Sequence, residues 1–276
     1  MHGLGNDFIV IDGISQRLDG LPLDQMAQRW CDRHFGIGAD GLILVTESQI
    51  QDFKMQIFNS DGSEPETCGN GIRCFAKFVY DNGLSTKEVF SVETGAGPVL
   101  PALILKEGRV ESVEVDMGVP ILTRSKIPMK GPDQDQVLEE LIRVDGHSFP
   151  VTAVSMGNPH AVIFVSDLRP LVLERLGPKL EKHPVFPKGV NVEFVQVLNK
   201  QEAVMVVWER GAGETLACGT GACAVLVAGV LLNKLDRQAV VHLPGGDLLI
   251  EWQEDTGHVM MTGPIETVFQ GESEFI

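Results

Sequence analysis

The chain is divided into short apolar runs, each bounded by Gly, Pro, Asn or Asp. Runs of this length and composition are typical of strands. They are Phe8–Ile11, Leu42–Val45, Val113–Val115, Ala161–Val165, Val204–Val207 and Leu248–Ile250. Asp12-Gly13 indicates a turn, and the polar segment Gly131–Glu140 indicates a loop. The pattern predicts a protein in which strands outnumber helices.

Two segments of helical length each follow a glycine-rich loop. One is Ile72–Tyr80, followed by Asp81-Asn82-Gly83, and the other is Ala222–Leu232, followed by Asn233-Lys234. The second segment is apolar on every side, so we expect its helix to run through the middle of its domain. It is also the longest apolar run and far shorter than the ~20 residues that cross a bilayer, so no membrane span is expected.

The chain repeats its landmarks at a spacing of about 150 residues. Cys68-Gly69-Asn70-Gly71 recurs as Cys218-Gly219-Thr220-Gly221. Four further pairs follow in the same order: Gly5-Asn6 with Gly157-Asn158, Asp40 with Asn191, Phe58–Gly62 with Trp208–Gly211, and Thr94–Gly97 with Leu243–Gly246. The repeat predicts two homologous domains of similar size.

The predicted fold class is α/β in the α+β sense, with two pseudo-symmetric domains. Each domain is expected to be a curved, mostly antiparallel sheet or barrel around one central helix. We place the N-terminal domain, which carries Cys68, at residues 1–118 plus 264–276. The C-terminal domain, which carries Cys218, is placed at 119–263. The last residues are thus expected to return to the first domain.

Composition and charge narrow the class of function. The 276 residues carry 22 Lys+Arg and 38 Asp+Glu, a net charge of −16. Such a surplus repels phosphate backbones and anionic lipid headgroups, which argues against a nucleic-acid or a membrane partner. The amino terminus lacks the pattern of a secretion signal, and the five cysteines match no common zinc spacing. We therefore expect a cytoplasmic protein with free thiols and no metal.

Each repeated loop places a cysteine just before a helix. The start of a helix presents unpaired N–H groups and a partial positive charge, which favour a thiolate and bind a carboxylate. We therefore expect Cys68 and Cys218 to have lowered pKa values. If the two domains face each other across a cleft, one thiolate can remove an α-proton while the opposite thiol delivers one. That arrangement inverts a carbon stereocentre.

A single Cys-Gly-x-Gly is more often a buried thiol beside a turn. Two copies at equivalent positions of a duplicated fold favour the catalytic interpretation. The other three cysteines do not fit a catalytic role: Cys74 and Cys223 lie within the predicted helices, and Cys31 follows Trp30 in a helical stretch. We predict that these three are core residues.

Five segments together resemble the diaminopimelate epimerase family over essentially the whole chain. They are His2–Phe8, Cys68–Cys74, Gly157–His160, Glu209–Gly211 and Ala217–Ala222. The resemblance implies an enzyme without pyridoxal phosphate or any other cofactor, which interconverts LL- and meso-diaminopimelate in lysine biosynthesis. It also implies a homodimer whose small-molecule substrate binds between the domains, with Cys68 and Cys218 as the acid/base pair. His160 and Glu209 match positions that tune the thiols.

The resemblance further implies a set of substrate-binding residues. Side-chain amides suit a ligand with two ammonium and two carboxylate groups, and Arg210 offers a planar fork for a carboxylate. The set is Asn6, Asn59, Gly69, Asn70, Asn158, Asn191, Glu209, Arg210, Gly219 and Thr220. The chain departs from the family at Gly41, where many members have glutamine, and it starts directly at the His2 segment. Phe269 lies where the family often has an aromatic residue at the dimer interface.

Two other functions fit parts of the pattern. A cofactor-independent racemase of another amino acid, such as histidine, would use the same two thiols with different distal contacts. Arg210 and the asparagines favour a substrate with a second carboxylate. A thiol-redox or non-catalytic binding protein could use the same cleft, and would keep its activity when Cys68 and Cys218 are changed to serine.

Overall fold

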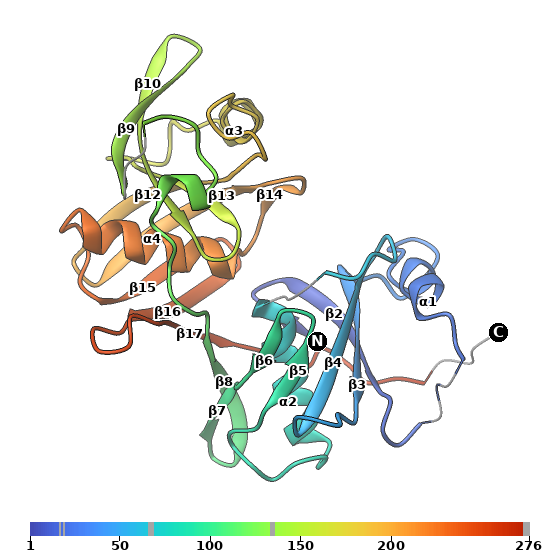
Figure 1. Cartoon of the computed structure of the whole chain (residues 1–276). Helices are drawn as coiled ribbons and strands as arrows, with labels where there is room; N and C mark the ends of the chain where they lie inside the picture. The colour runs from blue at the N-terminus through green and yellow to red at the C-terminus, as the bar shows by residue number, and fades with distance from the viewer. Residues whose placement is uncertain (17, 19, 66–68, 133–135, 273–276) are drawn as a thin grey trace. The chain divides into compact units, whose positions relative to one another are not determined.

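The structure is a computed structural model that describes residues 1–276 except 17, 19, 66–68, 133–135 and 273–276. Contacts within the chain divide it into two compact units. Unit 1 comprises Met1–Val115 and Thr262–Ile276, and unit 2 comprises Asp116–Met261. The chain thus leaves unit 1 once and returns to it at its carboxyl end (Figure 1).

Unit 1 is built on a six-stranded sheet with the strand order β1-β2-β3-β4-β5-β6. The strands are β1 (His2–Gly3), β2 (Asn6–Asp12), β3 (Gly41–Thr46), β4 (Phe53–Asn59), β5 (Val92–Thr94) and β6 (Gly97–Val99). Helix α1 (Leu23–Trp30) precedes β3, and α2 (Gly69–Asp81) follows β4. The hairpin of β7 (Ala102–Lys106) and β8 (Arg109–Asp116) leads out of the unit.

Unit 2 has the strand order β16-β15-β13-β12-β11-β10-β9, and β14 pairs with β13. The strands are β9 (Val137–Val144), β10 (His147–Ser155), β11 (Pro159–Phe164), β12 (Asn191–Asn199), β13 (Glu202–Glu209), β14 (Gly213–Thr215), β15 (Gln238–Leu243) and β16 (Gly246–Trp252), and β17 (Val259–Pro264) leads back to unit 1. The helical segments are the 3-10 turn η1 (Arg124–Lys126), α3 (Leu173–Glu181) and α4 (Gly219–Leu231).

The two sheets repeat one series of strand pairings, which confirms the predicted duplication. From β1 to β6 the pairs are antiparallel, parallel, antiparallel, parallel and antiparallel. The same series runs from β10 through β11, β12, β13 and β15 to β16. The predicted two-part α+β fold is therefore correct.

The strand register corrects one pair of the repeat. Phe8 on β2 is opposite Gly41 on β3, as His160 on β11 is opposite Asn191 on β12. The structural counterpart of Asn191 is therefore Gly41 and not Asp40. A shift of one residue moves a side chain to the other face of a sheet, so sequence likeness alone could not settle this position.

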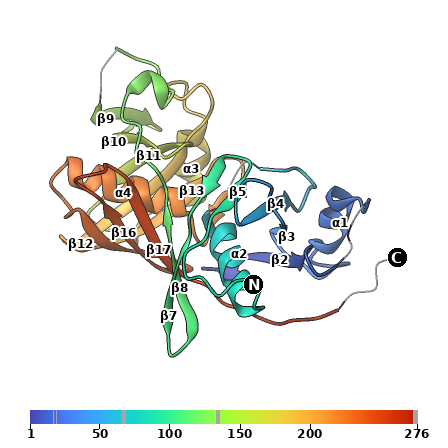
Figure 2. The same cartoon turned by 60° about the horizontal axis from the view of Figure 1, so that its bottom comes forward.

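Both predicted central helices form, and both start earlier than predicted. Helix α2 packs against β1–β4, and α4 packs against β10, β11, β12, β15 and β16 (Figures 1 and 2). Each begins at the glycine directly after the repeated cysteine, at Gly69 and Gly219. Residues 221–229 of α4 are buried throughout, as its apolar sequence predicts. Low helix propensity at the glycines hid the first turn from the sequence interpretation.

A second helix covers the other face of each sheet. Met26 and Ala27 of α1 pack against Leu42 of β3, and Leu176 and Leu180 of α3 pack in a cluster that includes β12. Because the sheets are covered on both faces, β3 and the first half of β12 are continuously buried. This explains why the sequence shows apolar runs there instead of alternation.

One predicted loop is partly wrong. The segment from Gly131 to Glu140 was expected to be irregular, but β9 begins at Val137 and pairs with β10. It is an edge strand with Leu138 and Leu141 exposed, so its sequence lacks the pattern of a buried strand. Among the described residues, no helix combines the length and apolarity that a bilayer span requires.

Candidate active site

Cys218 lies at the start of the central helix of unit 2. It is the N-cap residue of α4, with extended backbone angles, and its side chain is 4% exposed. The Cys218 Sγ atom lies 3.6 Å from the Thr220 hydroxyl oxygen, and the Glu209 carboxylate is near enough to act on the pKa of the thiol. A buried thiol therefore has one hydroxyl and one carboxylate as its immediate polar neighbours.

The pKa of Cys218 is opposite in direction to the sequence-based expectation. Burial raises the pKa well above that of an ordinary thiol, and the charges of Glu209 and Glu193 raise it further. The hydrogen bond to Thr220 acts in the other direction, but it is the smaller effect. Burial and the two carboxylates all favour the uncharged form, so Cys218 is a protonated thiol at neutral pH.

A hydrogen-bonded series of side chains continues from Thr220 into the core. Asn158 Nδ2 donates to Thr220 Oγ1 at 3.2 Å, and Asn158 Oδ1 lies 2.9 Å from His160 Nε2. His160 Nδ1 is 2.6 Å from Glu193 Oε1, and both of these side chains are fully buried. Burial raises the pKa of Glu193, although the His160 ring opposes this shift. Cys218, Thr220, Asn158 and His160 are therefore brought together as predicted members of one site.

Glu209 and Arg210 lie where β13 ends. The Glu209 carboxylate accepts a hydrogen bond from the Thr215 hydroxyl at 2.6 Å, which holds it beside Cys218. Asn191 Oδ1 accepts from the Arg210 backbone N–H at 2.8 Å, while Asn191 Nδ2 donates to the Pro159 carbonyl at 3.1 Å. The buried Asn191 amide thus ties three chain segments together and positions Arg210, whose side chain is exposed.

Unit 1 contains an equivalent contact between its predicted site residues. Asn70 Nδ2 donates to Asn6 Oδ1 at 3.0 Å, and Asn6 Nδ2 donates to Asp40 at 2.7 Å. Arg73, which is fully buried on α2, donates to Asn70 Oδ1 at 2.9 Å. By the repeat, the Asn6–Asn70 pair corresponds to the Asn158–Thr220 pair in unit 2.

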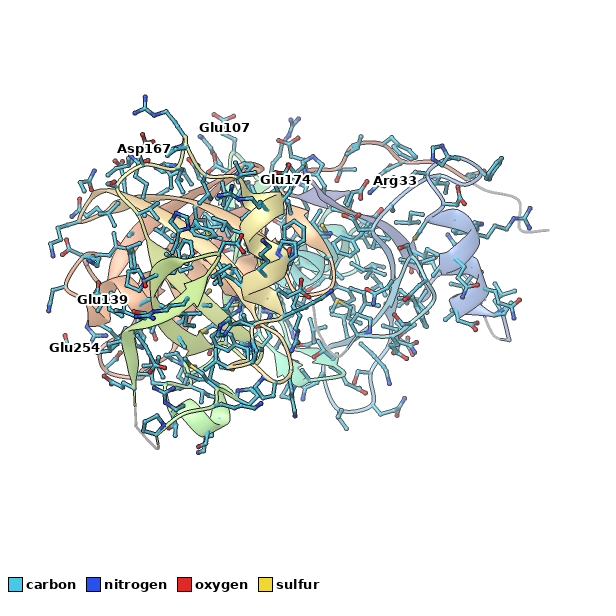
Figure 3. The ribbon with its side chains drawn as sticks, turned by 90° about the horizontal axis from the view of Figure 1, so that it is seen from above. Arg33, Glu107, Glu139, Asp167, Glu174 and Glu254 are labelled. Carbon is cyan, nitrogen blue, oxygen red and sulfur yellow. The ribbon has the colours of Figure 1, made fainter. Side chains whose placement is uncertain are left out.

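The outer part of the unit 1 cluster is an ion-pair network that sequence reasoning missed. Arg33, labelled in Figure 3, reaches the Asp7 carboxylate at 2.6 and 3.0 Å and Asp40 at 2.9 Å. Partial burial raises the pKa of Asp7, but Arg33 lowers it more, so the pKa of Asp7 lies below its usual value. The network anchors Asp40, the partner of Asn6. The Asp7 and Asp40 side chains could have been suspected because both flank predicted strands.

Four predicted site residues stand apart from these contacts. Cys68 lies outside the described residues. Asn59 is exposed, and its amide donates to the Ser63 hydroxyl at 2.9 Å within a turn. Gly69 and Gly219 contribute no side chain, but each is the first residue of its central helix, where backbone N–H groups lack partners within the helix.

Glu193 is the functional candidate that sequence reasoning missed in unit 2. It lies within the apolar run after Asn191, and we counted that run only as a strand. The available signal was an ionisable residue between buried apolar neighbours, which requires a partner. Cys31, Cys74 and Cys223 are buried, as predicted, and burial raises the pKa of Cys31 to about 11. In the described part of the chain, no three His, Cys, Asp or Glu residues come together as a metal site.

The fold is shared with several solved structures of low sequence identity. A hydroxyproline epimerase from Agrobacterium vitis, solved with trans-4-hydroxy-L-proline, matches with a TM-score of 0.64 and 15% identity, over 95% of this chain and 87% of that one. A Bacillus anthracis protein of the phenazine biosynthesis PhzF family matches with a TM-score of 0.67 and 16% identity, over 96% and 92%. These two structures show the fold alone. Relatives at least 50% identical to this chain, each named as an epimerase, show that it is an isomerase of the epimerase class.

The chain belongs to the diaminopimelate epimerase family. The family model matches residues 1–123 and 152–268. The diaminopimelate epimerase of Moorella thermoacetica is 55% identical over 99% of this chain and 97% of its own length. The enzymes of the same name from Pelotomaculum thermopropionicum and Methanococcus maripaludis are 54% and 50% identical over 98% and 99% of this chain. Both matches cover at least 96% of the length of these two relatives.

Proposed function

We propose that this protein interconverts LL- and meso-diaminopimelate by two-base proton transfer at cysteine, without a cofactor. The observation that carries the proposal is the Cys218 thiol at the start of α4, beside Thr220 and the Glu209 carboxylate, in a chain at least 50% identical to relatives named for this activity. The second base in this proposal is Cys68, which occupies the repeat-related position before α2.

Cys218 performs its half of the reaction by exchanging one proton with the substrate α-carbon. As the acid, it breaks its S–H bond, the carbanion's electron pair forms the new C–H bond, and sulfur keeps the S–H electron pair as a thiolate. The Thr220 hydroxyl stabilises that thiolate by donating to it. In the reverse direction the thiolate takes the α-proton, and Glu209 holds the thiol in its protonated state. Cys68 acts in the opposite sense, so no oxidant or reductant is consumed.

The remaining predicted residues are proposed to hold the substrate. The first N–H groups of α2 and α4, at Gly69, Asn70, Gly219 and Thr220, suit the carboxylate beside the reacting carbon. The exposed Arg210 fork suits the distal carboxylate. The amides of Asn6, Asn59 and Asn158 complete the set, whereas Asn191 acts by positioning Arg210.

The organisation of the protein forms part of the proposal. We propose domains at 1–118 with 264–276 and at 119–263, which lie close to the bounds of the two compact units. A homodimer is supported by the adjacent apolar side chains Val268 and Phe269, which are 64% and 63% exposed. Sedimentation of the purified chain tests this state directly. A cytoplasmic location is supported by the four described cysteines, none of which is in a disulfide.

Incubation with LL-diaminopimelate in deuterium oxide tests the reaction. We expect meso product that carries deuterium at the inverted carbon. Cys68→Ser and Cys218→Ser should each abolish inversion, whereas Cys223→Ala, a buried thiol in the same helix α4, should keep it. Exchange with histidine or another single amino acid, and none with diaminopimelate, would support a different racemase. Full inversion by both serine variants would overturn the cysteine mechanism, and no inversion or exchange by the wild-type protein would support a redox or binding role.

A further inference from the structure

We propose that Glu193 is a positioning residue of the catalytic thiol. Acting through His160, Asn158 and Thr220, Glu193 sets the direction of each hydrogen bond in the series, so that the Thr220 hydroxyl is free to donate to the Cys218 sulfur. This inference rests on the proposed function, because it concerns the thiol that exchanges the substrate proton.

The series is continuous from a fully buried carboxylate to the sulfur atom. Its four steps are Glu193–His160 at 2.6 Å, His160–Asn158 at 2.9 Å, Asn158–Thr220 at 3.2 Å and Thr220–Cys218 at 3.6 Å. Glu193 Oε2 has no hydrogen-bond partner among the described residues. Among the described residues, the His160 ring is the side chain that hydrogen-bonds to this carboxyl group.

Glu193 also lies directly against the start of α4. A Cβ atom built on Gly221 would be 3.0 Å from Glu193 Oε1 and 3.3 Å from Cys218 Sγ. Only a glycine leaves this gap between the carboxylate and the thiol unfilled. The close approach explains why the carboxylate affects the sulfur electrostatically as well as through the series.

The proton count fixes one direction along the series. Asn158 Nδ2 donates to Thr220, so Asn158 Oδ1 accepts from His160 and Nε2 must carry a proton. His160 Nδ1 and Glu193 Oε1, at 2.6 Å, then require one proton between them. A neutral ring paired with a protonated carboxyl and a charged ring paired with a carboxylate both satisfy this count. In both cases the pair is neutral, which suits its complete burial.

The direction of the series decides what Thr220 can do. Because Thr220 accepts from Asn158, its own hydroxyl proton can point to sulfur and stabilise the thiolate. If the His160 proton moved from Nε2 to Nδ1, the Asn158 amide would have to turn and accept from Thr220. The Thr220 hydroxyl would then donate to Asn158 and no longer to the sulfur, so Cys218 would be a weaker acid. Glu193 opposes this in either neutral state of the pair: a protonated carboxyl donates to Nδ1, and a carboxylate holds a ring that is protonated at both nitrogens.

Three titratable groups face Glu193 from the elements packed against it. They are His160 on β11, Glu209 at the end of β13 and Cys218 at the start of α4. Glu209 acts on the thiol directly, so its effect must be separated from that of the series. Measurement on His160 itself achieves this separation, because Glu209 takes no part in the His160 hydrogen bonds.

Nitrogen-15 NMR of the full chain labelled at its seven histidines tests the direction of the series. The His160 resonances are assigned by their loss in His160→Asn. We expect Nε2 to be protonated at neutral pH in the wild-type protein. In Glu193→Gln, the Nε2 proton should persist and Nδ1 should be unprotonated, because the glutamine amide donates to it. An unprotonated Nε2 in the wild-type protein overturns the proposal.

Kinetics of matched variants test the consequence. Glu193→Met keeps length but cannot bind Nδ1, and we expect kcat to fall about tenfold, as for loss of one hydrogen bond to a charged group. Glu193→Gln should recover most of that loss. Gln196→Met is the control, because it removes a hydrogen bond of the same strand β12 outside the series and should leave kcat unchanged. A folded Glu193→Met enzyme with wild-type kcat overturns the proposal.

The two readouts separate this inference from the proposed function. The NMR measurement needs no substrate, so a protonated Nε2 supports the series even if diaminopimelate is not inverted. Normal inversion with an unprotonated Nε2 overturns the series alone. If Glu193→Met fails to fold, the wild-type and Glu193→Gln spectra still decide the outcome.

Discussion

Gly221→Ala perturbs the site at the closest approach between its thiol and its buried carboxylate. An added Cβ would lie 3.0 Å from Glu193 Oε1 and 3.3 Å from both Cβ and Sγ of Cys218. These are tight contacts, and both neighbours must move by a few tenths of an ångström. The variant therefore displaces the reacting sulfur without removing a functional group.

The expected effects on stability and activity differ. Alanine in place of glycine inside a helix gains about 1 kcal/mol, whereas overpacking a buried site costs about 1–3 kcal/mol. The free energy of unfolding should therefore fall by no more than about 2 kcal/mol. Because a misplacement of about 1 Å costs roughly a hundredfold in rate, a shift of a few tenths should lower kcat about tenfold.

Gly229→Ala is the matched control on the same helix. Its added Cβ would lie 2.6 Å from Leu235 Cδ1 and 2.7 Å from Leu235 Cγ, a harsher clash, about 12 Å further along α4. We expect it to destabilise the protein more than Gly221→Ala and to leave kcat of the folded enzyme unchanged. Thermal unfolding and initial rates of inversion measure both effects. Wild-type kcat in Gly221→Ala, or equal kcat losses in the two variants, would refute the reasoning.

Two further predictions concern charge. Burial is the main cause of the raised pKa of Cys218, and Glu209 adds to it, so Glu209→Gln should lower the pH at which the ultraviolet absorbance of the thiolate appears. Inversion should slow by about 10²–10⁴, because the carboxylate that acts on the thiol proton is lost. An unchanged midpoint of the thiolate titration would contradict this prediction. Arg33→Met removes the partner that lowers the pKa of Asp7 below 3.8. The ion pair contributes to stability above pH 3.8, and the contribution is lost as the pH falls further. We expect a loss of about 1 kcal/mol or less at neutral pH, because the pair is partly exposed. Thermal unfolding against pH should show the difference from wild type narrowing in acid, and a constant difference would argue against the assignment.

Local signals predicted much of the fold. The apolar runs located strands such as β3, β11 and β13, and the all-apolar segment after Cys218 located the buried helix α4. Strand β9 was missed because an edge strand is exposed on one side and carries charged residues. The helix starts at Gly69 and Gly219 were missed because tertiary packing overrides the low propensity of glycine.

The site was predicted less evenly. Cys218, Asn158, Thr220 and His160 were recognised because they lie in repeated or resembling segments, and the structure connects them by hydrogen bonds. Glu193 was not recognised, because a carboxylate inside a strand becomes informative only when its partner is known.

The duplication, the family and the residue types at the site follow from the order and identity of residues along the chain. The pKa direction of Cys218, the contact of Asn191 with Arg210 and the connection of Glu193 to the thiol became known from the folded structure. Desolvation and hydrogen-bond direction depend on which atoms surround a group. Packing between strands and helices far apart in the chain sets those surroundings.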